Sequence, residues 1–317
     1  MQSAFAPLLH ASRAMVLDCG AGVRLQAFHA IPAPPPGKAA AAPRLAVLLH
    51  GWEGSADSIY VLSLASQLFA RGFEVLRLNL RDHGATHHLN RELFHSCRLA
   101  EVVGAVRHIQ SLFPAKTLHL AGFSLGGNFM LRVAAQAHLA GLRIAKVLAI
   151  SPVLDPAATL HALETGFSAY HGYFLRKWGR SLALKQAAWP EEYDFSALRG
   201  MRSVRLMTAE LVRRYTEFAS LEEYLDGYAI VGSRLAPLAV PATIIIALDD
   251  PIIPARDLER LAPTASLRVI ATRQGGHCGF MERIGARTWA EYRAALELDL
   301  PAPAEAATLR CDASPRS

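Results

Sequence analysis

Short apolar runs alternate with longer amphipathic runs along most of this chain, and this alternation limits the fold more than any other feature. The apolar runs are typical of buried β-strands and lie at residues 45–50, 74–80, 117–122, 146–151, 242–247 and 267–271. The amphipathic runs place apolar residues three and four apart, as helices do, at 57–71, 97–112, 126–139, 255–262 and 283–297. Near-continuous apolar strands that alternate with helices predict an α/β fold with a mostly parallel central sheet and helices on both faces.

One long stretch, residues 155–236, breaks this alternation. It contains aromatic and basic residues, as in "YHGYFLRKWGR", and no run typical of a buried strand. We therefore expect a helical insertion between two strands of a single domain that spans residues 1–317. The other expected parts of this domain are a core at 13–154 and 237–300, a Pro-rich surface loop at 32–43 and a mobile C-terminal tail at 301–317.

The sequence "GFSLG" around Ser124 matches the pattern G-x-S-x-G and lies directly after a predicted strand and directly before a predicted helix. In this position Gly122 and Gly126 permit a sharp turn that projects the serine hydroxyl above the sheet. The following helix points its free N–H groups and the positive end of its dipole at the same place, where they stabilise a developing oxyanion. The pattern predicts that Ser124 is a nucleophile, with a purely structural glycine-rich turn as the alternative.

A serine hydroxyl needs a base to take its proton and an acid to orient that base. On a sheet of this kind both partners are expected after later strands, in the chain order Ser, Asp, His. Asp249 and Asp250 follow the predicted strand at 242–247, and His277 lies in a glycine-flanked loop after the next strand. We predict His277 as the base and one aspartate as the acid. The other aspartate is expected to cap or form the turn.

The loop after the first central strand, "LLHGWEGS" at 48–55, is where a second oxyanion donor is expected. The two predicted donors are the backbone N–H groups of Trp52 and Leu125, because Gly51 allows the loop to approach the serine closely. His50 in the same loop is expected to have a structural role through hydrogen bonds.

The net charge of +6 raises the question of a nucleic-acid partner. The arginines are scattered along the chain, whereas a nucleic-acid footprint gathers them on one face, so we predict none. The longest apolar runs fall far short of the ~20 residues that span a bilayer, so no membrane span is predicted. The N-terminus has neither a basic leader nor a clear cleavage site, and the four cysteines form no C-x-x-C pair. We therefore expect free thiols and a cytoplasmic location.

The segment "RDHGATHHLNRELFHS" at 81–96 contains several side chains of types that bind metals. These side chains are Asp82, His83, His87, His88 and His95. Their spacing matches no metal-binding signature, so no metal is predicted. We expect instead a polar loop at the carboxyl edge of the sheet, in which His83 and His95 form hydrogen bonds with backbone groups near the active site.

Seven motifs occur in order along the chain, namely "HGWEGSADSIYV", "NLRDHG", "LFHS", "GFSLGGN", "YTEFASLEEY", "ALDDPIIP" and "GGHCGF". Together they resemble the YheT-like branch of the α/β-hydrolase superfamily over residues 13–298. This resemblance implies an eight-stranded α/β-hydrolase core, a helical lid and hydrolysis of carboxylic esters without a cofactor. It also implies a triad of Ser124, Asp250 and His277, since the family spacing A-x-x-D-x-I-I-P falls on Asp250 and leaves Asp249 as the alternative.

Two features depart from the family pattern. Asp82 stands where relatives have glycine in an R-G-H-G turn, which leaves the conformation of this loop open. The membrane anchor of some eukaryotic relatives has no counterpart, which weakens the inference of a membrane phospholipid substrate.

The sequence therefore predicts a serine esterase that cleaves a small-molecule ester through an acyl-enzyme. An acyltransferase with the same triad and a non-catalytic binding protein on this fold are the alternatives. The aromatic residues of the insertion are expected to line the acyl pocket or to pack the insertion on the core, and they include Tyr170, Tyr173, Phe174 and Trp178. No motif encodes the acyl group, the leaving alcohol or the oligomeric state.

Overall fold

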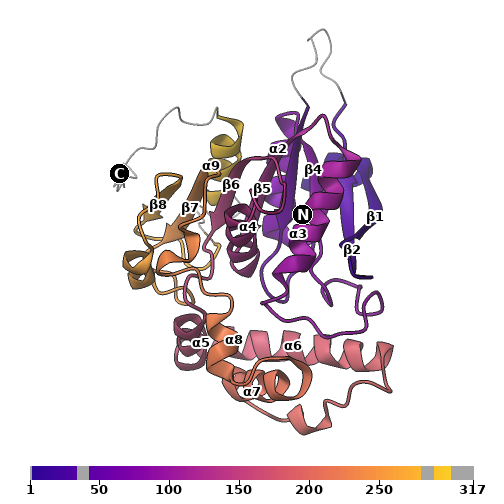
Figure 1. Cartoon of the computed structure of the whole chain (residues 1–317), viewed down its shortest axis with the longest axis vertical. Coiled ribbons are helices and arrows are strands. Elements are labelled where there is room, and N and C mark those ends of the chain that lie inside the picture. Colours follow the sequence, from indigo (N-terminus) through magenta and orange to yellow (C-terminus); the bar gives the residue numbers. More distant parts are fainter. Residues whose placement is uncertain (1, 34–42, 280–288, 301–317) are drawn as a thin grey trace.

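A central sheet organises the structure, a computed structural model that describes residues 2–33, 43–279 and 289–300 of the 317-residue chain. The sheet has eight strands in the order β1-β2-β4-β3-β5-β6-β7-β8 (Figure 1). The strands are β1 Ser12–Asp18, β2 Arg24–Ala30, β3 Arg44–Leu49, β4 Glu74–Leu78, β5 Thr117–Phe123, β6 Ile144–Ile150, β7 Ala242–Ala247 and β8 Leu267–Thr272. Neighbours among β3 to β8 pair parallel, whereas β1 with β2 and β2 with β4 pair antiparallel. The predicted mostly parallel sheet is confirmed.

The six predicted strands correspond to β3 to β8, with bounds that agree within two residues. These strands are easy to recognise because the central ones are buried on both faces, and in β5 every residue after Thr117 is buried. β1 and β2 are not among the predicted strands. β1 lies at the edge of the sheet, and only Leu17 of its residues is buried, so it carries no continuous apolar run.

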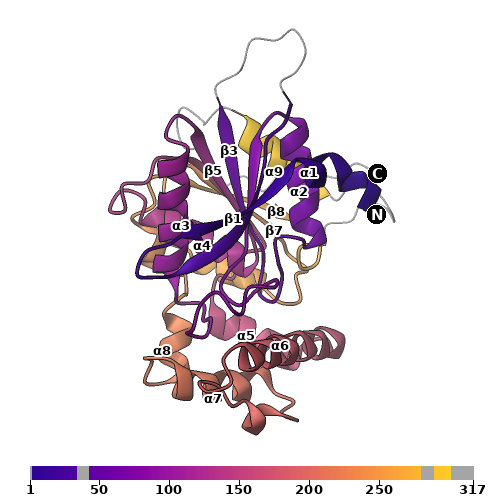
Figure 2. The same cartoon turned by 90° about the vertical axis from the view of Figure 1, so that its right-hand side faces the viewer.

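Helices cover both faces of the sheet, as predicted (Figure 2). α3 and α4 pack on one face, and α2 and α9 pack on the other together with α1, so that an apolar layer lies on each side. The bounds are η1 Gln2–Phe5, α1 Ala6–Ala11, α2 Ile59–Ala70, α3 Leu99–Leu112, α4 Leu125–Ala135 and α9 Trp289–Asp299. The helices predicted at 57–71, 97–112 and 126–139 are therefore confirmed, although α4 ends at Ala135.

The segment at 255–262 is not an α-helix, which corrects the prediction. It forms a short 3₁₀-helix, η4 Ala255–Arg260. Pro263 follows it, and because the residue before a proline is disfavoured in the α conformation, Ala262 cannot continue the helix. Of the predicted helix 283–297, the part from Trp289 onwards lies in α9, and residues 283–288 lie outside the described part. The loop predicted at 32–43 lies largely outside the described residues, and the tail predicted at 301–317 lies wholly outside them.

The region between β6 and β7 is helical, and we call residues 156–235 the helical segment. It comprises α5 Pro156–Thr165, α6 Ser168–Ala188, η2 Ser196–Leu198, α7 Val204–Tyr215, α8 Leu221–Asp226 and η3 Ser233–Leu235. Asp155 begins the segment by accepting hydrogen bonds from the N–H groups of Ala157 and Ala158. Apolar clusters of its own hold these helices together. The segment lies beyond the carboxyl ends of the parallel strands (Figure 1).

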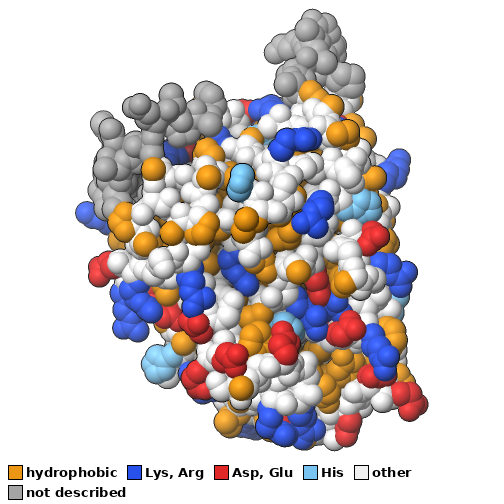
Figure 3. Space-filling model, in the orientation of Figure 1, with side chains coloured by type: hydrophobic (Ala, Val, Ile, Leu, Met, Phe, Trp, Pro, Cys, Tyr) orange, Lys and Arg blue, Asp and Glu red, His pale blue; other side chains and the backbone are white. Residues whose placement is uncertain are grey.

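The surface of the molecule mixes charges of both signs. On the face shown in Figure 3, basic and acidic side chains are interspersed over the sheet region and the helical segment. Within the helical segment, Arg213 and Arg214 pair with Glu210, and Arg234 pairs with Asp226. Of the helices in the described ranges, none combines the length and the apolar character needed to cross a bilayer.

Candidate active site

Ser124 occupies the junction between β5 and α4 in a strained backbone conformation. Its φ of 51° and ψ of −119° are unusual for a residue with a side chain, and such conformations cost about 1–3 kcal/mol. Two glycines make the tight junction possible. A Cβ atom on Gly122 would lie 2.3 Å from the Gly126 carbonyl oxygen, and one on Gly126 would lie 2.3 Å from the His50 carbonyl oxygen. Only glycine fits at both positions, as the G-x-S-x-G pattern indicates.

The side chains of Ser124, His277 and Asp250 come together in a continuous row. His277 Nε2 lies 3.0 Å from Ser124 Oγ, and His277 Nδ1 lies 2.9 Å from Asp250 Oδ2. The side chain of Asp250 is fully buried, and its Oδ1 accepts hydrogen bonds from the N–H groups of Ile252 and Ile253. Because a carboxylate only accepts, His277 carries its proton on Nδ1. Its Nε2 is then free to accept the proton of the Ser124 hydroxyl.

The two neighbouring aspartates differ in what they contact. Asp250 faces His277, whereas Asp249 is exposed and accepts a hydrogen bond of 2.9 Å from the N–H group of Gly276. Asp249 therefore ties the turn after β7 to the loop that carries His277. Local spacing alone left the choice between the aspartates open, and the family resemblance indicated Asp250, which is the aspartate beside His277 in the structure.

The loop after β3 lies directly against Ser124. A Cβ atom on Gly51 would lie 3.2 Å from Ser124 Cβ. The buried His50 ring holds this loop, because Nδ1 donates to the Gly51 carbonyl at 2.7 Å and Nε2 accepts from the Leu80 N–H at 3.2 Å. Burial lowers the pKa of His50 to about 4, so the ring is neutral at physiological pH, and the predicted structural role of His50 is confirmed.

The two predicted oxyanion donors are next to the serine. Leu125 is the first residue of α4 and follows Ser124 directly, and Trp52 follows Gly51. Among the hydrogen bonds between described residues, none uses the N–H group of Trp52 or of Leu125. Both donors are therefore available for a ligand.

A cavity of about 400 Å³ opens above Ser124 and His277, between the sheet and the helical segment. Its wall is largely apolar. The four aromatic residues singled out in the sequence all lie in this wall, namely Tyr170, Tyr173, Phe174 and Trp178. α5 contributes Leu160 and Leu163, and α7 contributes Val204 and Thr208. All of these residues come from the helical segment, so that segment shapes one side of the cavity.

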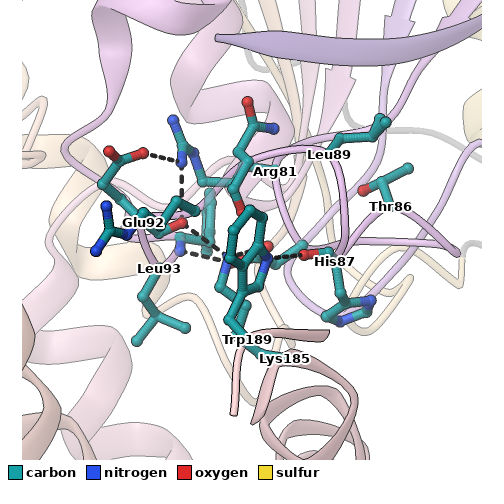
Figure 4. A network of polar contacts seen from close by, with 12 residues as sticks. Arg81, Thr86, His87, Leu89, Glu92, Leu93, Lys185 and Trp189 are labelled. Carbon is teal, nitrogen blue, oxygen red and sulfur yellow. Dashed lines mark hydrogen bonds and ion pairs between the residues drawn. The ribbon is translucent and has the colours of Figure 1, made fainter. Parts of the chain in front are cut away.

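Asp82 adopts the left-handed backbone conformation, with a φ of 57°, that glycine takes most readily. Its carboxylate is held in place by two donors: Lys185 Nζ at 2.9 Å and the N–H group of Phe94 at 2.8 Å. Lys185 Nζ also donates to the carbonyls of Asn90 and Glu92, at 2.7 and 3.0 Å. Figure 4 shows Lys185 of α6 reaching this loop. The loop, whose conformation the sequence left open, is thus docked on α6.

His83 and His95 of this loop have different surroundings. His83 Nδ1 donates to the Arg81 carbonyl at 2.6 Å, as expected. The backbone hydrogen bond expected for His95 is wrong for the described residues, because its ring packs edge-on against Phe218 and Tyr224 instead. Within the described ranges, no group of three or more His, Cys, Asp or Glu side chains could hold a metal ion.

Two charged residues of the cavity wall, Glu53 and Lys177, were missed by the sequence analysis. Glu53 has a φ of 57°, and burial raises the pKa of its carboxyl to about 8. Lys177 Nζ donates to the Glu53 carbonyl at 3.2 Å. The sequence did offer a signal for Glu53, because it lies two residues after Gly51 in the loop expected to supply an oxyanion donor. It offered no signal for Lys177, because the position of that side chain depends on how α6 packs.

Comparisons with known proteins identify the family that this chain resembles and structures that share its fold. A model of the family described as the alpha/beta hydrolase fold matches residues 46–284. YheT of Escherichia coli K12, named as a candidate esterase, is 27% identical over 81% of this chain and 77% of its own length. Phospholipase ABHD3 of Mus musculus is 23% identical over 76% of this chain, which spans only 59% of that enzyme. The structure of serine hydrolase CCSP0084 from Cycloclasticus zankles superposes with a TM-score of 0.58 at 16% identity, covering 91% and 98% of the two chains.

The family match covers more than half of the chain and includes the turn at Ser124 and the loop at His277. The solved structure shares the fold, and the resemblance to YheT that the motifs indicated is confirmed. This chain therefore belongs to the α/β-hydrolase fold family.

Proposed function

We propose that this protein is a carboxylic ester hydrolase in which Ser124 is the nucleophile, His277 the general base and Asp250 the residue that orients the imidazole. The observation that carries the proposal is the row of hydrogen bonds from Ser124 Oγ through His277 to Asp250, at 3.0 and 2.9 Å, beside an apolar cavity. The esterase and phospholipase names of the relatives YheT and ABHD3 support the same class of reaction.

In the proposed first half-reaction, Ser124 Oγ attacks the acyl carbon of the ester while its proton passes to His277 Nε2. The tetrahedral intermediate collapses when the bond to the alcohol oxygen breaks and His277 returns the proton to that oxygen. The alcohol leaves, and the acyl group remains on Ser124. In the second half-reaction a water molecule gives its proton to His277 and attacks the acyl carbon. Collapse releases the carboxylic acid and restores the Ser124 hydroxyl.

The negative charge of each tetrahedral intermediate needs donors that are fixed before the reaction begins. In this proposal the backbone N–H groups of Trp52 and Leu125 supply them. Two observations support this role. Neither N–H group has an acceptor among the described residues, and both residues lie beside Ser124 in the cavity wall. Asp250 meanwhile stabilises the positive charge that the His277 ring acquires.

We also propose that the helical segment is a lid that belongs to the same domain as the sheet. It supplies much of the cavity wall around Ser124 and lies beyond the carboxyl ends of the parallel strands (Figure 1). An apolar cavity of about 400 Å³ fits the acyl part of an ester, because apolar walls favour burial of a hydrocarbon chain.

A panel of p-nitrophenyl esters graded by acyl chain length tests the proposed reaction. The wild-type protein is expected to release p-nitrophenol and the free acid, and Ser124→Ala is expected to reduce kcat by about 10³-fold or more. The matched control is Ser111→Ala, a change on α3 outside the cavity wall. Product analysis with added alcohol separates hydrolysis from acyl transfer. Full activity of the Ser124→Ala variant would contradict the proposal. If the main product with added alcohol is a new ester, the reaction is acyl transfer and not hydrolysis.

A further inference from the structure

The loop after β3 ends in a hydrogen-bonded turn at residues 51–54. The Gly54 N–H donates to the Gly51 carbonyl at 3.0 Å, so Trp52 and Glu53 are the two central residues of this turn. Glu53 has a φ of 57°, and Trp52 is not among the residues with positive φ. That combination is typical of a type II turn, whose third position favours glycine. The turn is therefore strained at Glu53, and contacts around it must hold its conformation.

The core of the protein holds the first part of this turn. The His50 ring donates to the Gly51 carbonyl at 2.7 Å, and the Gly51 N–H donates to the Tyr60 hydroxyl oxygen at 3.2 Å. The Gly51 carbonyl and the Trp52 N–H lie in one planar peptide unit, so the His50 contact also orients that N–H. The Trp52 side chain packs in part against the main apolar core. Neither hydrogen bond is made to Glu53, the strained residue.

The tip of the turn is held by α6 of the helical segment. The ring of Trp52 stacks on Phe174, with centroids 5.2 Å apart and an angle of 10° between the planes, and meets Trp178 edge-on at 5.1 Å. Lys177 Nζ donates to the Glu53 carbonyl at 3.2 Å. Positions 174, 177 and 178 are three and four residues apart and so share one face of the helix. One face of α6 therefore contacts both central residues of the turn.

Other contacts hold α6 in place further along its length. Lys185, two turns after Lys177, donates to Asp82, Asn90 and Glu92 in the loop after β4. The Trp189 indole N–H adds a bond of 2.9 Å to the His87 carbonyl, as Figure 4 shows. The anchored helix presents its other end to the turn at 51–54.

We propose that Lys177 is a positioning residue: by holding the Glu53 carbonyl, it keeps the strained turn in the conformation that presents the Trp52 N–H group to the oxyanion site. This inference rests on the proposed function, because it takes the Trp52 N–H as an oxyanion donor. It makes α6 a part of that donor site and not only a wall of the acyl pocket. The turn then keeps this conformation fully only when α6 is docked on it.

A comparison of an oxygen ester with its thiono analogue tests this role, because a thiocarbonyl sulfur accepts hydrogen bonds far more weakly than a carbonyl oxygen. The test measures the ratio of kcat/KM for p-nitrophenyl butyrate to that for p-nitrophenyl thionobutyrate. In Lys177→Met, which keeps the apolar stem, kcat for the oxygen ester is expected to fall about 10-fold, less than the 10²–10³-fold cost of deleting a donor. The ratio is expected to fall with it. Lys177→Arg, which keeps a cationic donor, is expected to recover part of both.

Arg176→Met is the matched control, because Arg176 is an exposed neighbour on the same helix. It is expected to leave the ratio and kcat unchanged. The positioning role would be overturned if Lys177→Met lowered kcat/KM equally for both esters or lowered it for neither. A raised KM with an unchanged ratio of the two kcat/KM values would also overturn it. Thermal unfolding of each variant shows whether the fold is intact. Failure of the proposed function looks different, because the wild type would then hydrolyse neither ester or Ser124→Ala would retain the activity.

Discussion

Lys185 Nζ lies 2.9 Å from Asp82 Oδ1, and this ion pair joins the helical segment to the loop after β4 out of contact with water. Both side chains are buried. Burial raises the pKa of Asp82 to about 6 and lowers that of Lys185, since each charged form is costly away from water. Attraction between the two charges and the backbone partners of Lys185 offset that cost.

Removing one partner of this pair is expected to destabilise the protein more than removing both. Lys185→Met leaves the Asp82 carboxylate buried without its cation, which should lower the free energy of unfolding by about 3–5 kcal/mol. Adding Asp82→Asn removes the remaining charge and should recover part of that loss. Urea denaturation of the two single variants and the double variant at pH 7 measures this coupling. Additive losses would contradict a coupled pair.

The sequence predicted the site residues that lie in local motifs. Ser124 follows a buried strand between two glycines, and His277 lies in a glycine-flanked loop after another, so each is marked by its own neighbours. The bond between Lys185 and Asp82 joins positions 103 residues apart in the chain. Neither position carries a signal of the other, because the contact exists only once α6 has packed on the loop. Long-range pairs of this kind are set by tertiary structure, which periodicity does not encode.

The same distinction applies to the fold. The predicted strands β3 to β7 have apolar runs because most of their residues are buried, whereas β1 shows mostly exposed residues and gives no such signal. The prediction at 255–262 was wrong because apolar residues three apart suit a short 3₁₀-helix as well as an α-helix. The family resemblance supplied the count of eight strands that the runs alone did not.

The two aspartates after β7 should differ in their effect on catalysis. Asp250→Asn replaces the acceptor of His277 Nδ1 by an amide, which favours the wrong tautomer of the ring, and kcat should fall about 10⁴-fold. Asp249→Asn keeps an oxygen that can accept from Gly276 N–H, so kcat should fall far less. Assays of both variants on the same ester give the ranking. The reverse order would assign the orienting role to Asp249.

The cavity wall on α7 should limit acyl chain length. Thr208→Phe adds apolar volume to the cavity and is expected to lower kcat/KM for long-chain p-nitrophenyl esters while leaving the acetate nearly unchanged. Thr165→Phe is the matched control, because Thr165 is exposed at the end of α5. An equal loss on short and long esters in Thr208→Phe would mean that the acyl chain lies elsewhere.

Glu53 should make the stability of the protein depend on pH. Its pKa is raised from a usual value near 4.5 to about 8, because burial disfavours the charged form. Between these values the unfolded chain has lost the proton that the folded chain keeps, so this group lowers stability as pH rises. Glu53→Gln does not titrate, and its stability relative to the wild type should therefore increase from pH 5 to pH 8.

The exposed Glu222 of α8 gives the control for this measurement. Unfolding free energies of the wild type, Glu53→Gln and Glu222→Gln are compared at both pH values. A difference between wild type and Glu53→Gln that does not change with pH would rule out a raised pKa for Glu53.

The central claim is that Ser124 is the nucleophile, and covalent labelling tests it most directly. A fluorophosphonate reacts with a serine whose hydroxyl is activated by a neighbouring base, and His277 Nε2 is 3.0 Å from Ser124 Oγ. Peptide mapping by mass spectrometry, combined with the residual ester hydrolysis at each degree of labelling, gives one decisive data set. The account predicts a single adduct on Ser124 and activity that falls in proportion to it. An adduct on another serine, or hydrolysis that survives complete labelling of Ser124, would contradict it.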